Sequence, residues 1–110
     1  MSPRPLVVLV TAPSAEEAAR IGRVLVEERL AACVNVLPGV TSIFFWEGKL
    51  EESPEALMLI KTDPQRYEAL ERRVLELHPY SVPEVLALPV EAGSPAYLSW
   101  VSESTAREGR

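Results

Sequence analysis

Three segments of the chain are apolar at successive positions, and they constrain its fold more than any other feature. They lie at residues 6–10 (LVVLV), 56–60 (ALMLI) and 85–90 (VLALPV). Because alternate side chains of a strand point to opposite faces of a sheet, such runs are typical of strands that are buried on both faces. We therefore expect a sheet that needs a cover on each side.

Helix signals separate these strands. Ser14 and Glu17 have the spacing of a capping box, which predicts a helix from there to about residue 30. Asp63 followed by Pro64 predicts the start of a second helix, and the Ser-Pro pair at 94–95 predicts a short third one. The pattern is thus one of strands and helices in alternation.

The segment after the first helix predicts a β-hairpin. Residues 32–52 alternate and are rich in Val, Ile, Phe and Trp. The Pro-Gly pair at 38–39 predicts a bulge or bend, and Glu-Gly-Lys at 47–49 predicts a turn. Ser-Pro at 53–54 predicts a break before the next strand.

The predicted order is β-α-β-β-α-β with an extended β-hairpin and a C-terminal helix, which is the ferredoxin-like α+β arrangement. Crossovers between parallel strands are right-handed, so both main helices are expected on one face of the sheet. The other face then stays apolar and uncovered, and apolar patches of that size are unusual in monomers. We therefore predict an obligate oligomer in which the open sheet faces meet.

The composition predicts a single ordinary domain at residues 1–110, with a core at about 6–101 and a flexible C-terminal tail. The formal charge of −5 argues against nucleic acid and anionic membranes as partners. No apolar run approaches the roughly 20 residues of a membrane helix, and the first residues do not resemble a signal peptide. We expect a cytoplasmic protein.

The counts of amides and prolines predict heat resistance. The chain contains one Asn, one Gln and ten Pro, and the prolines lie mostly between the predicted elements. Fewer amides and more loop prolines belong to the features of heat-resistant proteins.

The only histidine, His78, lies between the second helix and the third apolar strand. On the residues alone, the favoured interpretation is a cation that closes the helix, with Pro79 stopping it. The alternatives are a metal ligand or a general base. One His and one Cys cannot form a closed zinc site, so a metal would need carboxylates, solvent or neighbouring copies, and Cu(II) suits such mixed donors.

Cys33 begins the hairpin, where a free cysteine is most often a small buried hydrophobe. A nucleophilic pair of Cys33 with His78 is conceivable, but no third orienting group can be named. The chain also has no GxGxxG and no Walker A motif. We therefore expect no enzymatic activity and no organic cofactor. The aromatic and charged tip of the hairpin, which includes Trp46 and Lys49, is either a contact for a ligand or partner subunit or an ordinary solvated end.

Three long motifs resemble the CutA family of divalent-cation tolerance proteins. They are ERLAACVNVLPGVTSIFFWEGKLEE, LMLIKT and LHPYSVPEVLALPV, and the resemblance extends from residue 6 to about residue 101. It implies a ferredoxin-like protomer similar to the PII signal-transduction proteins, assembled as a homotrimer and linked to tolerance of copper and other divalent cations. It also implies metal contacts at Cys33 and His78 and intersubunit clefts that include Tyr80 and Glu84. The candidate metal ligands are Cys33, His78 and Glu84, and the candidate cleft residues are Tyr80, Trp46, Lys49 and Lys61.

Two departures from the family pattern bear on metal binding. Ser81 stands where relatives commonly have an acidic residue, and Phe44 stands where they usually have tyrosine. The leading hypothesis is a non-enzymatic trimer that binds divalent copper in metal-ion tolerance. The alternative is a PII-like signalling module that binds a small ligand in its clefts or a partner protein at its hairpin, and a third is a hydrolase or transferase that uses Cys33.

Overall fold

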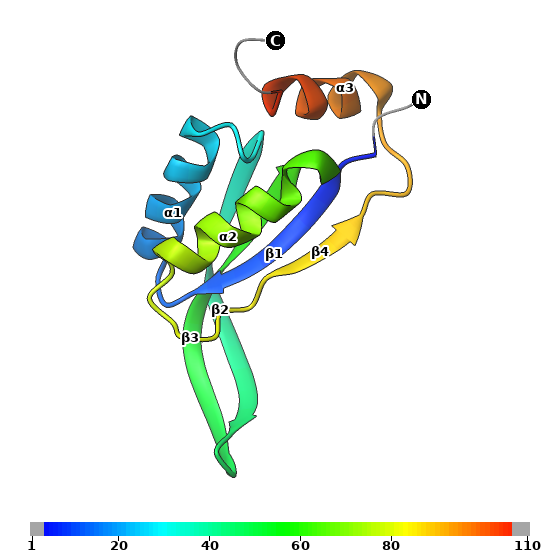
Figure 1. The fold of residues 1–110 in the computed structure, drawn as a ribbon. Helices are drawn as coiled ribbons and strands as arrows, with labels where there is room; N and C mark the ends of the chain where they lie inside the picture. The colour runs from blue at the N-terminus through cyan, green and yellow to red at the C-terminus, as the bar shows by residue number, and fades with distance from the viewer. Residues whose placement is uncertain (1–3, 107–110) are drawn as a thin grey trace.

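A four-stranded antiparallel sheet in the order β2-β3-β1-β4 forms the centre of the fold (Figure 1). The computed structural model describes residues 4–106, so only residues 107–110 of the predicted flexible tail lie outside the described residues, whereas residues 102–104 belong to a helix. The strands are β1 Leu6–Ala12, β2 Cys33–Trp46, β3 Lys49–Thr62 and β4 Leu86–Pro89. Adjacent strands are antiparallel throughout. The predicted ferredoxin-like α+β class is confirmed.

Helices α1 (Ala15–Glu27) and α2 (Tyr67–Leu77) cover one face of this sheet, and α3 (Pro95–Ser104) lies beyond its end (Figure 1). A short 3₁₀ turn η1, Pro64–Arg66, leads directly into α2, and the Asp63 carboxylate accepts a hydrogen bond from Gln65 N at 2.9 Å. Within the described residues, no helix is long and apolar enough to cross a membrane.

The predicted start of α1 is confirmed, but its end is not. Ser14 Oγ accepts a hydrogen bond from Glu17 N at 3.1 Å, whereas the Glu17 carboxylate pairs with Arg20 instead of returning to the cap. The helix ends at Glu27, three residues earlier than predicted. The chain turns here because Arg29 has a left-handed φ of 60°, and the next two backbone N–H groups both donate to Leu25 O.

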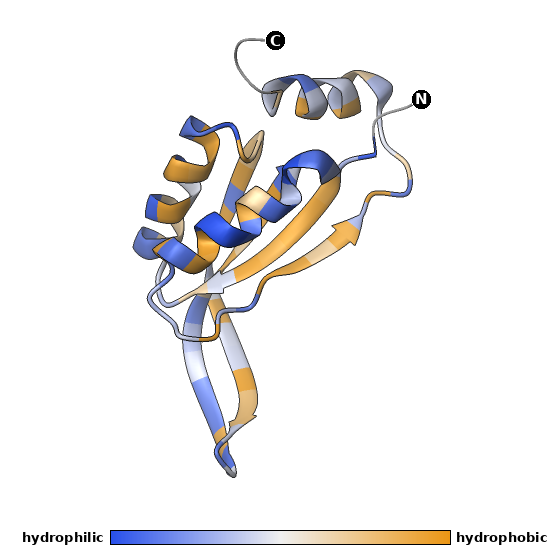
Figure 2. Ribbon diagram, viewed as in Figure 1, coloured by the Kyte–Doolittle hydropathy of each residue, from blue (hydrophilic) through white to orange (hydrophobic). Residues whose placement is uncertain are grey.

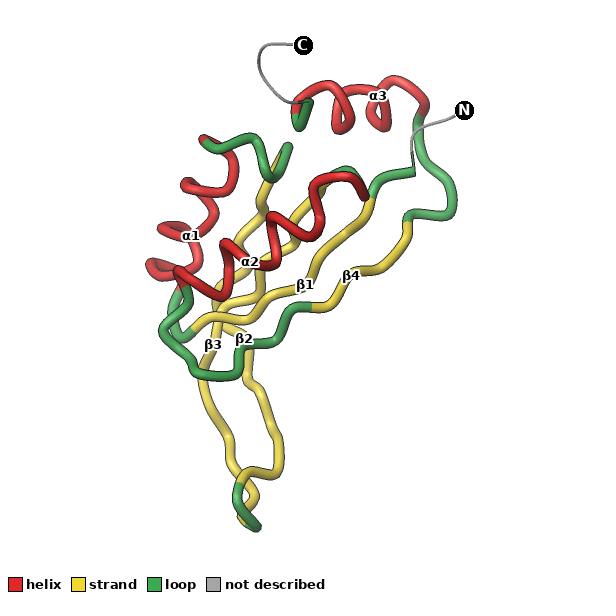
Figure 3. The backbone as a smooth tube through the Cα atoms, viewed as in Figure 1, coloured by secondary structure: helices red, strands yellow, loops and turns green. Residues whose placement is uncertain are grey.

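The β2–β3 hairpin extends well beyond the rest of the sheet (Figure 3). Glu47 and Gly48 both have positive φ, of 51° and 79°, as a two-residue type I′ turn requires. The predicted bulge near residues 38–39 is confirmed by a register shift between Leu37 and Val40. The predicted break at 53–54 is wrong, since β3 continues through both residues.

Proline is tolerated inside β3 because of where β1 ends. The last pair between these strands is Ala12 with Ala56, so Pro54 lies in a part of β3 that has a hydrogen-bonding neighbour only in β2. A missing backbone N–H that faces away from the single partner strand removes no ladder hydrogen bond.

The core lies between the sheet and helices α1 and α2. The buried strand residues Val8, Val10, Met58 and Ile60 alternate along β1 and β3 and pack against the helices. Figure 2 shows hydrophobic residues along nearly all of β1 and β4. The alternate positions of these strands form the open face, which lies opposite the two helices.

The open face is apolar in its central rows, as predicted. Leu9 pairs with Leu59 of β3 and with Leu86 of β4, and Val7 pairs with Leu88. The side chains of Leu86 and Leu88 are 56% and 49% exposed. Towards its two ends the face becomes polar, with Lys61 at one end and Glu55 at the other.

Polar contacts join the helices to one another. Arg73 binds both carboxylate oxygens of Glu28, at 2.9 and 3.0 Å, and this contact lowers the pKa of Glu28. Arg20 donates to Leu77 O at 2.9 Å, which links the start of α1 to the end of α2. Ser102 of α3 donates to Asp63 at 2.6 Å and holds the C-terminal helix against the β3–α2 connection.

Candidate functional site

A cleft of about 800 Å³ lies where the open face passes onto the hairpin. One wall is one side of the hairpin, from its base to near its tip, and the other is the connection between α2 and β4. Register explains the first wall, because every second residue of β3 from Glu51 to Leu57 points to the open face. The lining residues are Thr11, Ser42, Ile43, Phe44, Trp46, Glu51, Ser53, Glu55, Tyr80, Ser81, Val82 and Glu84.

Glu55 is the best-fixed charge of the cleft. Its carboxylate accepts hydrogen bonds from Ser42 Oγ and from the Tyr80 hydroxyl, each at 2.6 Å. Partial burial and then the hydrogen bond and charge of Glu55 raise the pKa of Tyr80 to about 12. The tyrosine is therefore a neutral donor at physiological pH, and it orients the carboxylate.

His78 packs against the ring of Tyr80 and bonds its backbone. The histidine is 7% exposed, and its ring centroid lies 4.8 Å from that of Tyr80. Nδ1 accepts a hydrogen bond from Tyr80 N at 3.1 Å, and Nε2 lies 2.7 Å from Thr11 O. A backbone N–H needs a lone pair on Nδ1, and a carbonyl needs a proton on Nε2. The partners thus assign a neutral ring with its proton on Nε2.

This arrangement differs from both leading interpretations of His78. The residue does follow the last turn of α2, and its backbone N–H bonds Val74 O. Its ring, however, does not close the helix as a cation, because it bonds β1 and the connection after the helix. Neither ring nitrogen has a lone pair left for a metal while these hydrogen bonds persist.

The three candidate metal ligands do not converge within one chain. Cys33 pairs with Lys61, and Lys61 pairs with Val7 of β1. His78 binds Thr11, which lies four residues further along β1, or about 13 Å away at about 3.3 Å per residue. The described residues contain no group of three His, Cys, Asp or Glu side chains that could hold an ion. Within residues 4–106, the side chains of a single chain therefore do not fit a metal site.

The structure brings together only part of the predicted cleft set. Tyr80, Trp46 and Glu84 line the cleft, whereas Lys49 pairs with Trp46 in the hairpin without lining it. Lys61 lies at the other end of the sheet, where its ammonium group bonds Asn35 Oδ1.

Sequence reasoning missed Glu55 and Ser42. A signal for Glu55 exists in the alternation of β3, since it shares a face with Leu57 and Leu59. A carboxylate on the face that is predicted to be covered needs partners, and that requirement marks it as a candidate site residue.

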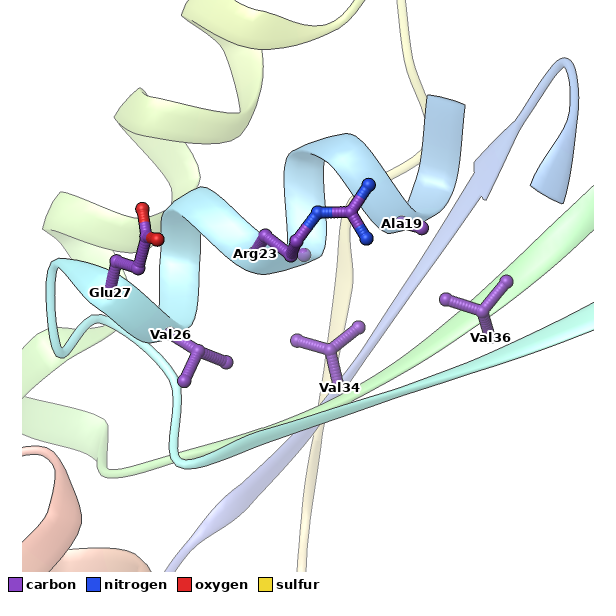
Figure 4. A pocket seen from close by; sticks show the side chains of 7 residues that line it. Ala19, Arg23, Val26, Glu27, Val34 and Val36 are labelled. Atoms are coloured by element: carbon purple, nitrogen blue, oxygen red, sulfur yellow. The ribbon is translucent and has the colours of Figure 1, made fainter. Parts of the chain in front are cut away.

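A second hollow, of about 380 Å³, lies between α1 and β2 (Figure 4). Val34 and Val36 of the strand form its floor, and Arg23 and Glu27 of the helix stand at its edge. Gly22 lets the helix approach, since a Cβ at this position would lie 3.0 Å from Val34 Cγ1. The floor is apolar and carries no group suited to chemistry.

Comparison with known proteins is consistent with this fold. Residues 6–104 match the family model described as CutA1 divalent ion tolerance protein. The divalent-cation tolerance protein CutA of Thermus thermophilus is 52% identical over 99 residues, which are 90% of this chain and 96% of that protein. Mouse protein CutA is 53% identical over 96 residues, but the chain covers only 54% of its length.

Solved structures agree with the sequence matches. The divalent cation tolerance protein Cut A1 of Thermus thermophilus has a TM-score of 0.90 at 51% identity, with 93% of this chain and 99% of that chain covered. CutA of Xylella fastidiosa has a TM-score of 0.91 at 42% identity, with 93% and 98% covered. With a family match over nearly its whole length, the chain belongs to the CutA1 divalent ion tolerance protein family.

Proposed function

We propose that the protein acts in divalent-cation tolerance as a homotrimer whose open sheet faces are turned inward. The names of its relatives from Thermus thermophilus and Pectobacterium atrosepticum support the tolerance role. The number of three subunits rests on the family resemblance. The same proposal holds that the protein is not an enzyme and works in the cytoplasm.

The apolar open face is the observation that carries this proposal. Its leucines on β4 are about half exposed in the single chain. Complete burial of a leucine stabilises by about 1.5–3 kcal/mol, and a row of them per subunit provides the driving force for association. Two helices already cover the other face, so a further copy of the sheet is the cover that matches this one in composition.

A test of assembly uses Leu86→Asp. Because Leu86 is already half exposed, the substitution leaves the folding of a single chain nearly unchanged but places a charge in the proposed interface. Leu75→Asp is the matched control, since Leu75 is 52% exposed on α2, outside the sheet. Sedimentation at low micromolar concentration should give trimers for wild type and Leu75→Asp, and monomers for Leu86→Asp. A folded wild-type monomer of 12.1 kDa would refute the trimer.

Copper is the divalent cation that we propose, since Cu(II) accepts mixed nitrogen and oxygen donors. One chain offers no three-donor group among residues 4–106, so the donors must come from several copies and from solvent. Calorimetric titration at pH 7.5 should therefore show Cu(II) binding to the wild type and much weaker binding to Leu86→Asp. Equal affinity of the two would contradict a site shared between subunits.

The tolerance role is tested in a bacterium that lacks its own CutA1-family protein. Expression of the wild type should raise the copper concentration that halves the growth rate. Leu86→Asp, at equal expression, should not. No difference between wild type and an empty vector would remove the support for the proposed function.

A second candidate function is favoured by the cleft. A hollow of about 800 Å³ with an oriented carboxylate and aromatic walls suits a small ligand, as in a PII-like signalling module.

A further inference from the structure

The charged lining of the cleft has one sign. Within residues 4–106, its charged side chains are Glu51, Glu55 and Glu84, all of them acidic. Carboxylates on the walls of a concave site repel anions and concentrate cations. Phosphates, nucleotides and carboxylic acids are thereby disfavoured as ligands.

The aromatic wall adds a second and independent preference. Phe44 and Trp46 occupy alternate positions of β2, so both point to the side of the hairpin that forms the cleft. In the single chain they are 42% and 53% exposed, so packing within the protomer leaves part of each ring uncovered. An aromatic face binds hydrocarbon and also attracts an organic cation through the negative potential of the ring face. Aromatic carbon offers no ligand to a metal ion.

Glu55 is fixed before any ligand arrives. Ser42 and Tyr80 hold one oxygen each, and His78 holds the backbone N–H of Tyr80. Each carboxylate oxygen can accept a further hydrogen bond, because an ionised carboxylate has about four acceptor positions. A group fixed in this way loses little conformational freedom when a ligand binds.

We propose that this cleft binds an organic cation, an amine whose ammonium group lies against Glu55 and whose hydrocarbon part contacts Phe44 and Trp46. The inference rests on the second candidate function and names its ligand class. The hydroxyl groups of Ser42 and Tyr80 both donate to Glu55. The remaining acceptor positions of the Glu55 carboxylate therefore suit an N–H donor. A free small amine and a lysine side chain of a peptide share this chemistry.

The test titrates three probes of nearly the same shape but different charge, namely phenethylamine, phenethyl alcohol and phenylacetate. The readouts are calorimetry and the indole N–H resonance of Trp46 in NMR spectra. The wild type should bind the amine at least tenfold more tightly than the alcohol, and phenylacetate more weakly than either. Equal affinity for the amine and the alcohol would overturn the proposal, as would preference for phenylacetate.

Glu55→Gln should lower the affinity for phenethylamine at least tenfold and leave that for the alcohol unchanged. Glu52→Gln is the matched control, since it removes the same charge three residues away on β3, from a side chain that does not line the cleft. An equal loss of affinity for phenethylamine in both variants would overturn the proposal, because the effect would then come from net charge alone. Trp46→Leu, at an exposed position that does not endanger folding, should weaken binding of both the amine and the alcohol. Unchanged binding in Trp46→Leu would also count against the site.

A lysine derivative identifies the source of the amine. Binding of N-acetyl-lysine methylamide more tightly than phenethylamine would assign the cleft to a protein side chain, and the reverse order would assign it to a free amine. Sedimentation of each variant shows whether the assembly is intact. The growth assay with copper then reports separately on tolerance, so failure of one proposal is distinguishable from failure of the other.

Discussion

At the scale of residues, a continuous series of hydrogen bonds connects β1 to the hairpin. It runs from Thr11 O through the ring of His78 to Tyr80 N, and from the Tyr80 hydroxyl through Glu55 to Ser42. Among the described residues, no buried side-chain nitrogen or oxygen lacks a partner. The lone histidine therefore bridges β1 and the connection after α2, and it positions a tyrosine of the cleft.

Replacing His78 should reveal this bridging role. His78→Ala removes two part-buried hydrogen bonds, each worth about 0.5–1.5 kcal/mol, and also removes the packing of a ring that is only 7% exposed. The free energy of unfolding, measured with denaturant at fixed protein concentration, should fall by at least about 2 kcal/mol. NMR of ¹⁵N-labelled wild type at pH 8 should show the proton on Nε2, and a proton on Nδ1 would contradict the assignment.

The hydroxyl of Tyr80 should lose its proton only at unusually high pH. Its pKa is raised from 10.0 to about 12, so the protonated form is favoured by the fold. The resulting stability is complete below about pH 10 and is lost as the pH rises through about 12. Burial also raises the pKa of Tyr67 and Tyr97, so the absorbance of tyrosinate must be compared with that of Tyr80→Phe. The difference between the two curves should have its midpoint near 12, and a midpoint near 10 would contradict the contact with Glu55.

At the scale of elements, the ends of helices and strands follow local hydrogen bonds. Ser14 accepts from Glu17 N, whereas Ser94 stands at the start of α3 without a side-chain hydrogen bond to it. Both serines precede helices and look alike as sequence signals. The structure shows that only one of them caps through its side chain.

The two serines form a matched pair for a stability measurement. Ser14→Ala should lower the free energy of unfolding by about 1 kcal/mol, the usual cost of losing an N-cap. Ser94→Ala should change it by a few tenths of that amount. Denaturant titration of both variants at one protein concentration makes the comparison, and equal losses would mean that the Ser14 contact contributes nothing.

At the scale of the whole molecule, the protomer is elongated, with extents of 48, 28 and 21 Å. The hairpin extends beyond the helices, and the apolar face opposite them is open (Figure 1). A chain of this shape exposes more apolar surface than a compact domain of its length. In the proposed trimer, association contributes to stability as well as to function.

Heat resistance is the expected outcome of that association together with few amides and many prolines. Scanning calorimetry should give an unfolding midpoint above the range of about 45–65 °C that is usual for mesophilic domains. The midpoint should rise with protein concentration for the wild type, because mass action favours the trimer. Leu86→Asp should unfold at a lower temperature that is independent of concentration. A wild-type midpoint inside the usual range would contradict the prediction.

Local periodicity in the sequence determined the strands, the helices, their order and the apolar face. These features depend on neighbours a few residues apart, which a single chain displays directly. The end of α1 and the continuity of β3 through Pro54 were not predictable in this way, because they depend on the conformation of Arg29 and on the length of β1.

Only the tertiary structure decided the cleft. Glu55 binds Ser42, which lies 13 residues away in the sequence, and Tyr80, which lies 25 residues away. The His78 ring binds Thr11, which lies 67 residues away. Local patterns hold no information about such pairs, since strand register and the path of the connection after α2 bring them together. For the same reason the sequence marked His78 as important but did not show that its ring bonds β1 and supports Tyr80.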